Sequence, residues 1–394
     1  MIYSIEALVA IVFGLIWLYK LRYFDDVRYS SIFFFFSYIY IFLGLILETQ
    51  QYKANFFYIY IYFSLFLVIV FCSFDRKIPI KRDYKFFNSR IFIGLYFLAF
   101  LLFCVFLLQS VSNIGLGSID GLEIDRLILV QEKKIVFYGL VIISPYLLVT
   151  ILHEVGYRAW LLGLFLLMIV IFLSGFRSPM LNIVIVSFLY FALYDKSFIK
   201  RRFILILLVG FILFGFATYL TIQRVGTNLT EAFLILADRL LTLNLRNIDN
   251  IMVHHELNDY FYGQTAIMDS WPLIGRALAF LGAERGSTYA EYITLELNPN
   301  SINGFVMTPT FFGISYADLP FIGLILHLFI FGLILVLILK WVRYLPLQAT
   351  FIYFFGITAT RGLFTTLILF FVPILIVHCI IKFCAKMDSQ HAGE

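Results

Sequence analysis

The chain has 394 residues and a formal net charge of +5; 62% of the residues are hydrophobic and only 13% are charged. This charged share is about half that of ordinary globular domains, too small to coat the apolar surface of a soluble fold. The composition therefore excludes soluble globular, disordered and fibrous proteins and predicts an all-α, polytopic integral membrane protein. In such a protein a basic excess sets the orientation in the bilayer, so we expect no nucleic-acid partner.

The apolar runs predict eleven membrane-spanning helices, since a bilayer core of about 30 Å needs about 20 helical residues. The first run follows Met1 without a basic segment or a cleavage site, so we expect a membrane helix there rather than a cleaved signal. The sixth and seventh runs, and the tenth and eleventh, are short enough to include a broken or re-entrant helix. In chain order the runs cover 3–19, 31–47, 54–74, 91–112, 135–152, 160–174, 180–194, 203–222, 314–339, 345–360 and 362–381.

Lys and Arg gather in the loops on one side of the predicted helices. Loop 75–90 and the other segments on its side hold 18 of the 29 Lys and Arg residues. Because cytoplasmic loops are enriched in these residues, this side is predicted to be the cytoplasm, with the N-terminus outside and the C-terminus inside. The other segments on this side are 20–30, 153–159, 195–202, 340–344 and the C-terminal tail.

One connection is far longer than the others and lies on the predicted outer side. It divides the chain into transmembrane helices over 1–222, a large outer loop over 223–313, and the last helices with the tail over 314–394. Loops of this length are uncommon without a function. All five cations of the loop are arginine, although Lys and Arg are equally common in the rest of the chain.

Two amphipathic helices are predicted within this loop. The first begins at Thr230 and places Arg239 and Arg246, seven residues apart, on one face. The second begins at 269–272 (DSWP), because proline suits the first turn of a helix, and ends at Gly282. Two such helices above a membrane base predict a lid that lies on the outer surface.

Arginine is the expected ligand for phosphate, because its planar guanidinium stays charged and can form two parallel hydrogen bonds. Arg177, Arg224 and Arg361 occupy predicted outer turns, where the orientation rule disfavours cations. They are candidate diphosphate-binding residues, together with Arg239 and Arg246 of the loop. For the three arginines in the turns, the alternatives are a side chain that reaches the interface from a helix end and an ion pair with a loop acid. For Arg239 and Arg246 the alternative is a solvated helix face.

Three residues are candidate bases that could deprotonate a hydroxyl group. His254 and His255 lie in the outer loop, and histidine can accept a proton near neutral pH. Asp318 lies just inside the outer end of the ninth run, where a carboxylate is expected to be functional. The alternatives are exposed loop histidines and an Asp318 that only pairs with an arginine. His327 and His378 lie deeper in their runs and are predicted to be packed polar residues.

The sequence lacks the common motifs of nucleotide-binding enzymes, serine hydrolases and zinc proteases. It lacks a P-loop, a dinucleotide-binding glycine pattern, a Ser-His triad signature and an HExxH sequence. The adjacent histidines have no further ligands at a fixed spacing, and the four cysteines predict neither a metal site nor a disulfide framework. We therefore expect no cofactor and no metal.

Two short motifs and the predicted topology resemble a known family. The sequence 175–179 (GFRSP) precedes the long loop, and 308–323 (TPTFFGISYADLPFIG) lies at its end. With eleven spans and one long outer loop late in the chain, the sequence is similar to the O-antigen polymerase (Wzy-type), or oligosaccharide repeat-unit polymerase, family. Arg177 resembles the arginine of a turn common in that family. The family often has Glu after the glycine of the second motif, whereas here Ile314 follows Gly313.

The resemblance implies a glycosyltransferase on the outer face of a bacterial inner membrane. The donor would be a glycan on undecaprenyl diphosphate, and the acceptor would be a sugar hydroxyl of a new lipid-linked repeat unit. Arginines would stabilise the departing lipid diphosphate without a metal, and a histidine or Asp318 would take the proton. Membrane lipids and a chain-length-regulating membrane protein are implied as partners. The aromatic residues that could stack on sugars are Tyr316, Tyr289, Tyr292 and Trp271.

Two other kinds of function are compatible with parts of the sequence. An O-antigen ligase has a similar layout and moves the glycan to the lipid A core. The acid-x-acid sequence 123–125 (EID) is typical of other, metal-dependent lipid-linked glycosyltransferases. A polysaccharide flippase would have cations within its spans, an internal repeat and no long outer loop. Here the middle of each predicted span is almost free of charge and the long loop is present, which favours the polymerase.

Overall fold

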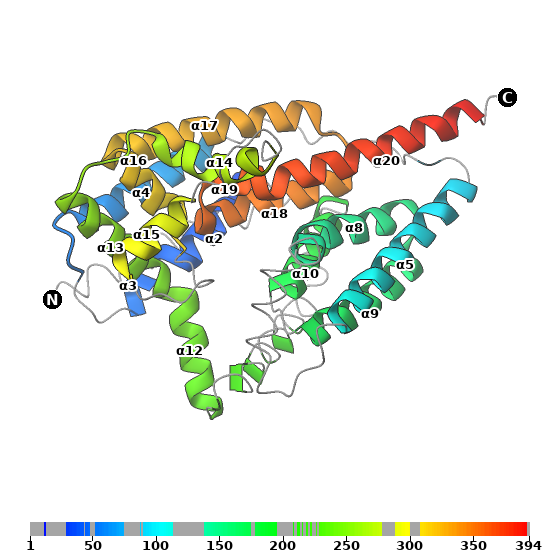
Figure 1. Cartoon of the computed structure of the whole chain (residues 1–394), viewed down its shortest axis with the longest axis horizontal. Coiled ribbons are helices and arrows are strands. Elements are labelled where there is room, and N and C mark those ends of the chain that lie inside the picture. The colour runs from blue at the N-terminus through cyan, green and yellow to red at the C-terminus, as the bar shows by residue number, and fades with distance from the viewer. Residues whose placement is uncertain are drawn as a thin grey trace. The chain divides into compact units, whose positions relative to one another are not determined.

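The chain is helical wherever its structure, a computed structural model, is described. Every regular element in these residues is a helix and none is a strand, so the predicted all-α class is confirmed for this part of the chain (Figure 1). The run predicted at 3–19 lies outside the described residues except for one position, and the run predicted at 203–222 is described only at scattered positions. Apart from isolated positions, the structure describes residues 29–42, 44–47, 52–74, 87, 90–112, 138–174, 178–194, 228–277, 288–299 and 308–391.

The chain forms two compact units, each assembled from segments far apart in the sequence. Unit 1 consists of Met1–Pro79, Ile235–Trp341 and Phe354–Phe370, and unit 2 consists of Ile80–Leu234, Val342–Tyr353 and Phe371–Glu394. Most of the predicted outer loop therefore belongs to the same unit as the N-terminal helices. The predicted boundaries at 222 and 313 stay predictions.

Unit 1 contains the helices that carry the candidate site. Its N-terminal part consists of α2 (Tyr29–Ser37), the π-helix η1 (Tyr38–Phe42), α3 (Gly44–Leu47) and α4 (Phe57–Phe74). The outer loop contributes α13 (Leu243–Leu257), α14 (Gln264–Ala277) and α15 (Tyr289–Leu297). The unit continues with α16 (Thr310–Asp318), α17 (Pro320–Trp341), the end of α18 (Leu345–Arg361), α19 (Leu363–Thr366) and most of the π-helix η6 (Leu367–Phe371).

Unit 2 is held together by buried polar pairs as well as by apolar packing. The Asn182 side chain accepts a hydrogen bond from the Tyr353 hydroxyl, and Glu154 accepts one from the Tyr344 hydroxyl at 2.9 Å. Such groups must be paired when they are buried, because an unpaired polar atom away from water is costly. The unit contains α5 (Arg90–Ser112), the π-helix η4 (Gly139–Ile143), α8 (Ser144–Glu154), α9 (Tyr157–Ser174), α10 (Ser178–Tyr194), the start of α18, and α20 (Val372–His391).

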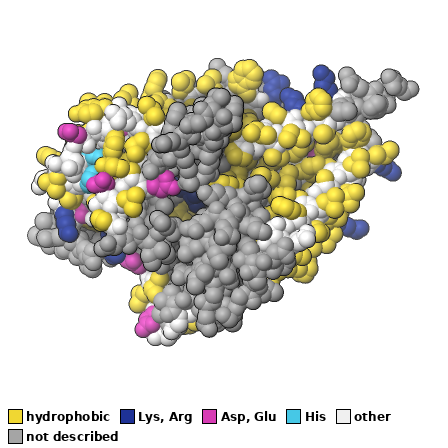
Figure 2. Space-filling view, viewed as in Figure 1, with side chains coloured by type: hydrophobic (Ala, Val, Ile, Leu, Met, Phe, Trp, Pro, Cys, Tyr) yellow, Lys and Arg dark blue, Asp and Glu magenta, His cyan; other side chains and the backbone are white. Residues whose placement is uncertain are grey.

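Two of the described helices are long and apolar enough to cross a membrane, Arg90–Val111 and Pro320–Ile338. Figure 2 shows hydrophobic side chains on the outer surface of α17, where Phe329 is 70% exposed. These helices support membrane character, whereas the count of eleven spans stays a prediction. Five shorter apolar helices overlap predicted runs: Ile32–Ile41, Phe57–Phe71, Gly139–Glu154, Tyr157–Ile171 and Pro179–Tyr194.

The predicted ninth span, 314–339, is wrong as a single helix. α16 ends at Asp318, Leu319 is extended (φ −161°, ψ 128°), and α17 begins at Pro320. The cause is the proline, which disfavours the helical conformation of the preceding residue and lacks an N–H group. The two helices then pack so closely that a Cβ atom on Gly323 would lie 2.2 Å from the Ser315 carbonyl oxygen.

The helices of the outer loop also differ from the prediction. α12 (Leu229–Leu241) begins close to the predicted start, but a turn at Thr242 separates it from α13. Arg239 and Arg246 therefore lie on two successive helices and not on one. α14 begins at Gln264, before the predicted start, because a distant side chain caps it (see below). The predicted first helix extends into α13, which is a separate helix, and α15 is not predicted from the sequence.

Candidate functional site

α13, which carries both histidines, is fastened to the segment that precedes α4. Asp249, 6% exposed, accepts hydrogen bonds from the backbone N–H of Lys53 (3.0 and 3.1 Å to its two oxygens) and of Ala54 (2.9 Å). Seven residues later, Glu256 accepts from the backbone and side-chain N–H groups of Asn55 at 2.9–3.2 Å. Carboxylates are favourable there because the first N–H groups of a helix carry partial positive charge. These contacts fix the helix that presents the histidines.

His255 is buried and held in one tautomer. Its Nδ1 lies 3.0 Å from the Asp259 carbonyl oxygen, which can only accept, so Nδ1 carries the proton. Its Nε2, 3.1 Å from the Tyr289 hydroxyl, then accepts a hydrogen bond from that group. Burial lowers the pKa of His255 to about 4 and raises the pKa of Tyr289 well above its usual range, so both groups stay neutral. Because its lone pair is already engaged, His255 is poorly placed to act as a base.

His254 is the more accessible of the two candidate histidines. Its side chain is partly exposed, and its ring stands perpendicular to the His255 ring at a centroid distance of 4.9 Å. Asn258 makes a long contact of 3.5 Å to its Nδ1, and Nε2 has no hydrogen-bond partner among the described residues. A base needs an available lone pair within reach of its substrate. The geometry therefore favours His254 over His255.

Aromatic rings line one side of the histidine pair. Phe261 packs edge-on against Tyr292 (5.4 Å between centroids) and Tyr289 (5.5 Å), and Tyr292 lies 6.4 Å from His254. Tyr292 is partly exposed and is the residue best placed to stack on a sugar. The predicted stacking role of Tyr316 does not fit its burial, since its ring packs against Tyr60 and Tyr260. The Trp271 side chain lies outside the described residues.

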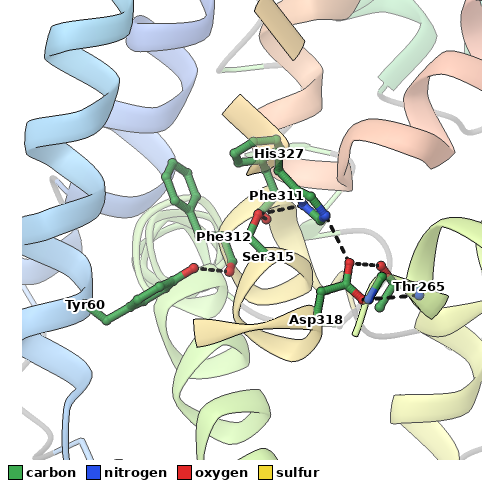
Figure 3. A network of polar contacts seen from close by, with 8 residues as sticks. Tyr60, Thr265, Phe311, Phe312, Ser315, Asp318 and His327 are labelled. Atoms are coloured by element: carbon green, nitrogen blue, oxygen red, sulfur yellow. Dashed lines mark hydrogen bonds and ion pairs between the residues drawn. The ribbon is translucent and has the colours of Figure 1, made fainter. Parts of the chain in front are cut away.

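Asp318 lies at the centre of a buried network between α14, α16 and α17 (Figure 3). Its Oδ1 accepts from the backbone N–H of Gly263 (3.1 Å) and of Thr265 (3.3 Å) at the start of α14. Its Oδ2 accepts from the Thr265 hydroxyl (2.6 Å) and lies 3.0 Å from His327 Nε2. The side chain is 2% exposed and its partner is His327 rather than an arginine. A carboxylate with four such contacts is suited to a structural role. The geometry therefore does not favour Asp318 as the base, and that role stays a prediction.

Ser315, Asp318 and His327 have the residue types of a serine nucleophile triad, but their surroundings differ from one. All three side chains are buried, and the Ser315 hydroxyl lies 2.7 Å from the Phe311 carbonyl oxygen as well as 2.8 Å from His327 Nδ1. A nucleophile needs an open path to its substrate. The three residues thus form an internal network, as the prediction of a packed His327 implies. The Tyr146 hydroxyl contacts His378 at 2.8 Å.

The candidate arginines are only partly described. Arg246, for which the alternative is a solvated helix face, forms an ion pair with Asp238 at 2.9 Å. The Arg361 guanidinium lies 5.1 Å from the centre of the Phe370 ring. Neither contact tests diphosphate binding. The remaining candidates, Arg177, Arg224 and the side chain of Arg239, lie outside the described residues.

The described residues contain no group of three or more His, Cys, Asp or Glu side chains that could hold a metal ion. The acid-x-acid sequence at 123–125 lies outside the described residues. Expectations about cofactors and metals therefore stay predictions.

Three functional contacts could not be found from sequence reasoning. Each contact joins two residues that are far apart in the sequence. The separation is 195 residues for the contact of Asp249 with Ala54, 53 for Thr265 with Asp318, and 34 for Tyr289 with His255. Only the proline at the α16–α17 break is a local signal, because the residue before a proline avoids helical geometry.

Comparison of the chain with protein-family models, with characterised proteins and with solved structures gives no match.

Proposed function

We propose that the chain is a multi-pass membrane glycosyltransferase that polymerises lipid-linked oligosaccharide repeat units. It transfers a glycan from undecaprenyl diphosphate to a sugar hydroxyl of a new lipid-linked repeat unit, as in O-antigen or a related surface polysaccharide. The reaction takes place on the outer face of a bacterial inner membrane, and the reaction itself needs no metal. The proposed topology has eleven spans, the N-terminus outside and the C-terminus inside, and it is supported by the distribution of Lys and Arg along the sequence.

The observation that carries this proposal is the position of His254. It lies partly exposed beside Tyr292, in the long loop that connects strongly apolar segments. A lipid-linked sugar must be reached from the membrane surface, and an aromatic ring next to a base can hold the sugar whose hydroxyl is deprotonated. The docking of α13 through Asp249 holds this base in place relative to α4.

In the proposed reaction, residues of this chain accept the proton and stabilise the leaving group, and no further reactant is needed beyond the two lipid-linked substrates. His254 Nε2 takes the proton from the acceptor hydroxyl, and the acceptor oxygen forms a bond with the anomeric carbon of the donor sugar. The bond between that carbon and the diphosphate oxygen breaks, and the lipid diphosphate leaves with the electron pair. Arg177 and Arg224 are proposed to stabilise this developing charge, because guanidinium groups remain cationic and bind phosphate through paired hydrogen bonds.

The proposal is tested by the surface polysaccharide of cells that express variants at matched membrane levels. We expect His254→Ala and Arg177→Ala to replace the polymer ladder with single repeat units. Arg177→Lys should restore little of the ladder, because lysine cannot form the two parallel hydrogen bonds of a guanidinium group. A full ladder in His254→Ala would overturn its role as the base. Accumulation of long lipid-linked chains without surface glycan would instead identify a ligase.

A further inference from the structure

The turn that joins α13 to α14 contacts the histidine pair at one end and the broken helix at the other. The Asp259 carbonyl oxygen accepts from His255 Nδ1 at 3.0 Å. Two residues later, Phe261 N–H donates to the Ala317 carbonyl oxygen at 2.8 Å, and Tyr262 N–H donates to the Asp318 carbonyl oxygen at 2.9 Å. The end of α16 leaves carbonyl groups without partners inside the helix, and this turn satisfies two of them.

The turn adopts a conformation that needs such support. Tyr262 has φ 51° and Gly263 has φ 89°, so two successive residues are left-handed. For a residue with a side chain this conformation is unfavourable and persists only where neighbouring contacts impose it. The Gly263 N–H donates to Asp318 Oδ1 at 3.1 Å, which supplies one such contact.

Asp318 can support the turn only while its carboxylate keeps one orientation. Thr265 and His327 fix that orientation, since the Thr265 hydroxyl (2.6 Å) and His327 Nε2 (3.0 Å) both contact Oδ2 (Figure 3). Oδ1 is then directed at the N–H groups of the turn and of α14. His327 itself is held by Ser315 at 2.8 Å and lies between the rings of Phe311 and Phe364 at 6.0 and 5.8 Å.

We propose that Thr265 and His327 are positioning residues for the histidine pair, acting through Asp318 and the turn 259–263. The contacts run from His327 to Asp318, from Asp318 to the turn, and from the Asp259 carbonyl to His255, whose ring packs against His254. The network therefore keeps the proton of His255 on Nδ1 and fixes the ring beside which His254 stands. The relevance of this arrangement to catalysis rests on the proposed function, whereas the arrangement itself does not.

The test uses the full chain, labelled with ¹⁵N-histidine and placed in lipid nanodiscs. The spectrum of the wild-type chain should show one neutral tautomer for His255, assigned by its loss in His255→Asn. Thr265→Val and His327→Phe should produce mixed tautomers or exchange broadening at His255. Thr265→Ser and His327→Gln, which keep a donor to Asp318, should restore the single tautomer. Ser270→Ala is the matched control, because its hydroxyl donates only to the Ala266 carbonyl of its own helix at 2.6 Å.

A merely structural role would lower the melting temperature of Thr265→Val and leave the His255 tautomer unchanged, and that result would overturn the proposal. Elongation of lipid-linked glycan, measured in parallel, should fall roughly tenfold to a hundredfold in Thr265→Val, the range expected when a catalytic group is misplaced. Altered tautomers in a chain that never elongates glycan would refute the proposed function and leave the positioning network standing. If Thr265→Val does not fold, the His327→Phe and His327→Gln pair decides the matter by the same spectra.

Discussion

Replacing Asp249 with alanine should open the junction between α13 and the start of α4. The carboxylate accepts hydrogen bonds from two backbone N–H groups, those of Lys53 and Ala54, and only the second residue is buried. Leaving one buried donor unpaired costs about 1–3 kcal/mol, and losing a bond at an exposed residue costs about 0.5–1.5 kcal/mol. We therefore expect Asp249→Ala to destabilise the junction by about 1.5–4.5 kcal/mol.

Asparagine at the same position provides a graded control. Oδ1 of Asp249 is the acceptor shared by both N–H groups, at 3.0 and 2.9 Å, and an asparagine oxygen can take its place. The bonds to a neutral oxygen are roughly half as strong as those to a carboxylate, so Asp249→Asn should cost less than Asp249→Ala.

Hydrogen–deuterium exchange of the peptide that covers Lys53 to Tyr60 measures this effect in the intact, membrane-embedded chain. Because about 1.4 kcal/mol corresponds to a tenfold change in an equilibrium constant, the Ala54 amide should exchange roughly tenfold to a thousandfold faster in Asp249→Ala. An unchanged exchange rate, or an equal effect of alanine and asparagine, would refute the reasoning that the carboxylate anchors α13.

Two further predictions concern close packing and titration. Gly323→Ala should destabilise unit 1 by about 1–3 kcal/mol, because the new Cβ would lie 2.2 Å from the Ser315 carbonyl oxygen. Gly94→Ala is the control and should be neutral or slightly stabilising, because no atom lies within 4 Å of its new Cβ. Thermal unfolding in detergent compares the two variants. The pKa of His255 is about 4 in the folded chain and near 6.5 in the unfolded chain, so the unfolded chain binds the proton more readily. The free energy of unfolding should therefore fall as the pH decreases from about 6.5 towards 4. The acid-induced decrease in melting temperature should be smaller in His255→Asn, and an identical decrease in both chains would contradict the assignment.

The helical class could be predicted because it depends on local sequence. Apolar composition and run length determine it, and α5 and α17 are found where long runs were expected. The break before Pro320 was also readable, since proline restricts the residue before it, but the apolar run on both sides favours one continuous span.

The capping of the loop helices could not be predicted, because it depends on contacts between distant segments. α14 begins at Gln264 because Asp318, 53 residues further along the chain, accepts the Thr265 N–H and hydroxyl. The local DSWP sequence suggests a later start and lies within the helix instead. Likewise, nothing near His255 in the sequence indicates that Tyr289 engages its Nε2, which leaves His254 as the more accessible histidine of the two.

The most direct test of the central claim is elongation by the purified chain in liposomes that contain a lipid-linked repeat unit with a polyprenyl diphosphate carrier. We expect a ladder of longer glycans from the wild-type chain and from His391→Ala, a histidine outside the site, and no ladder from His254→Ala. The absence of any ladder from the wild-type chain, or a full ladder from His254→Ala, would contradict the claim.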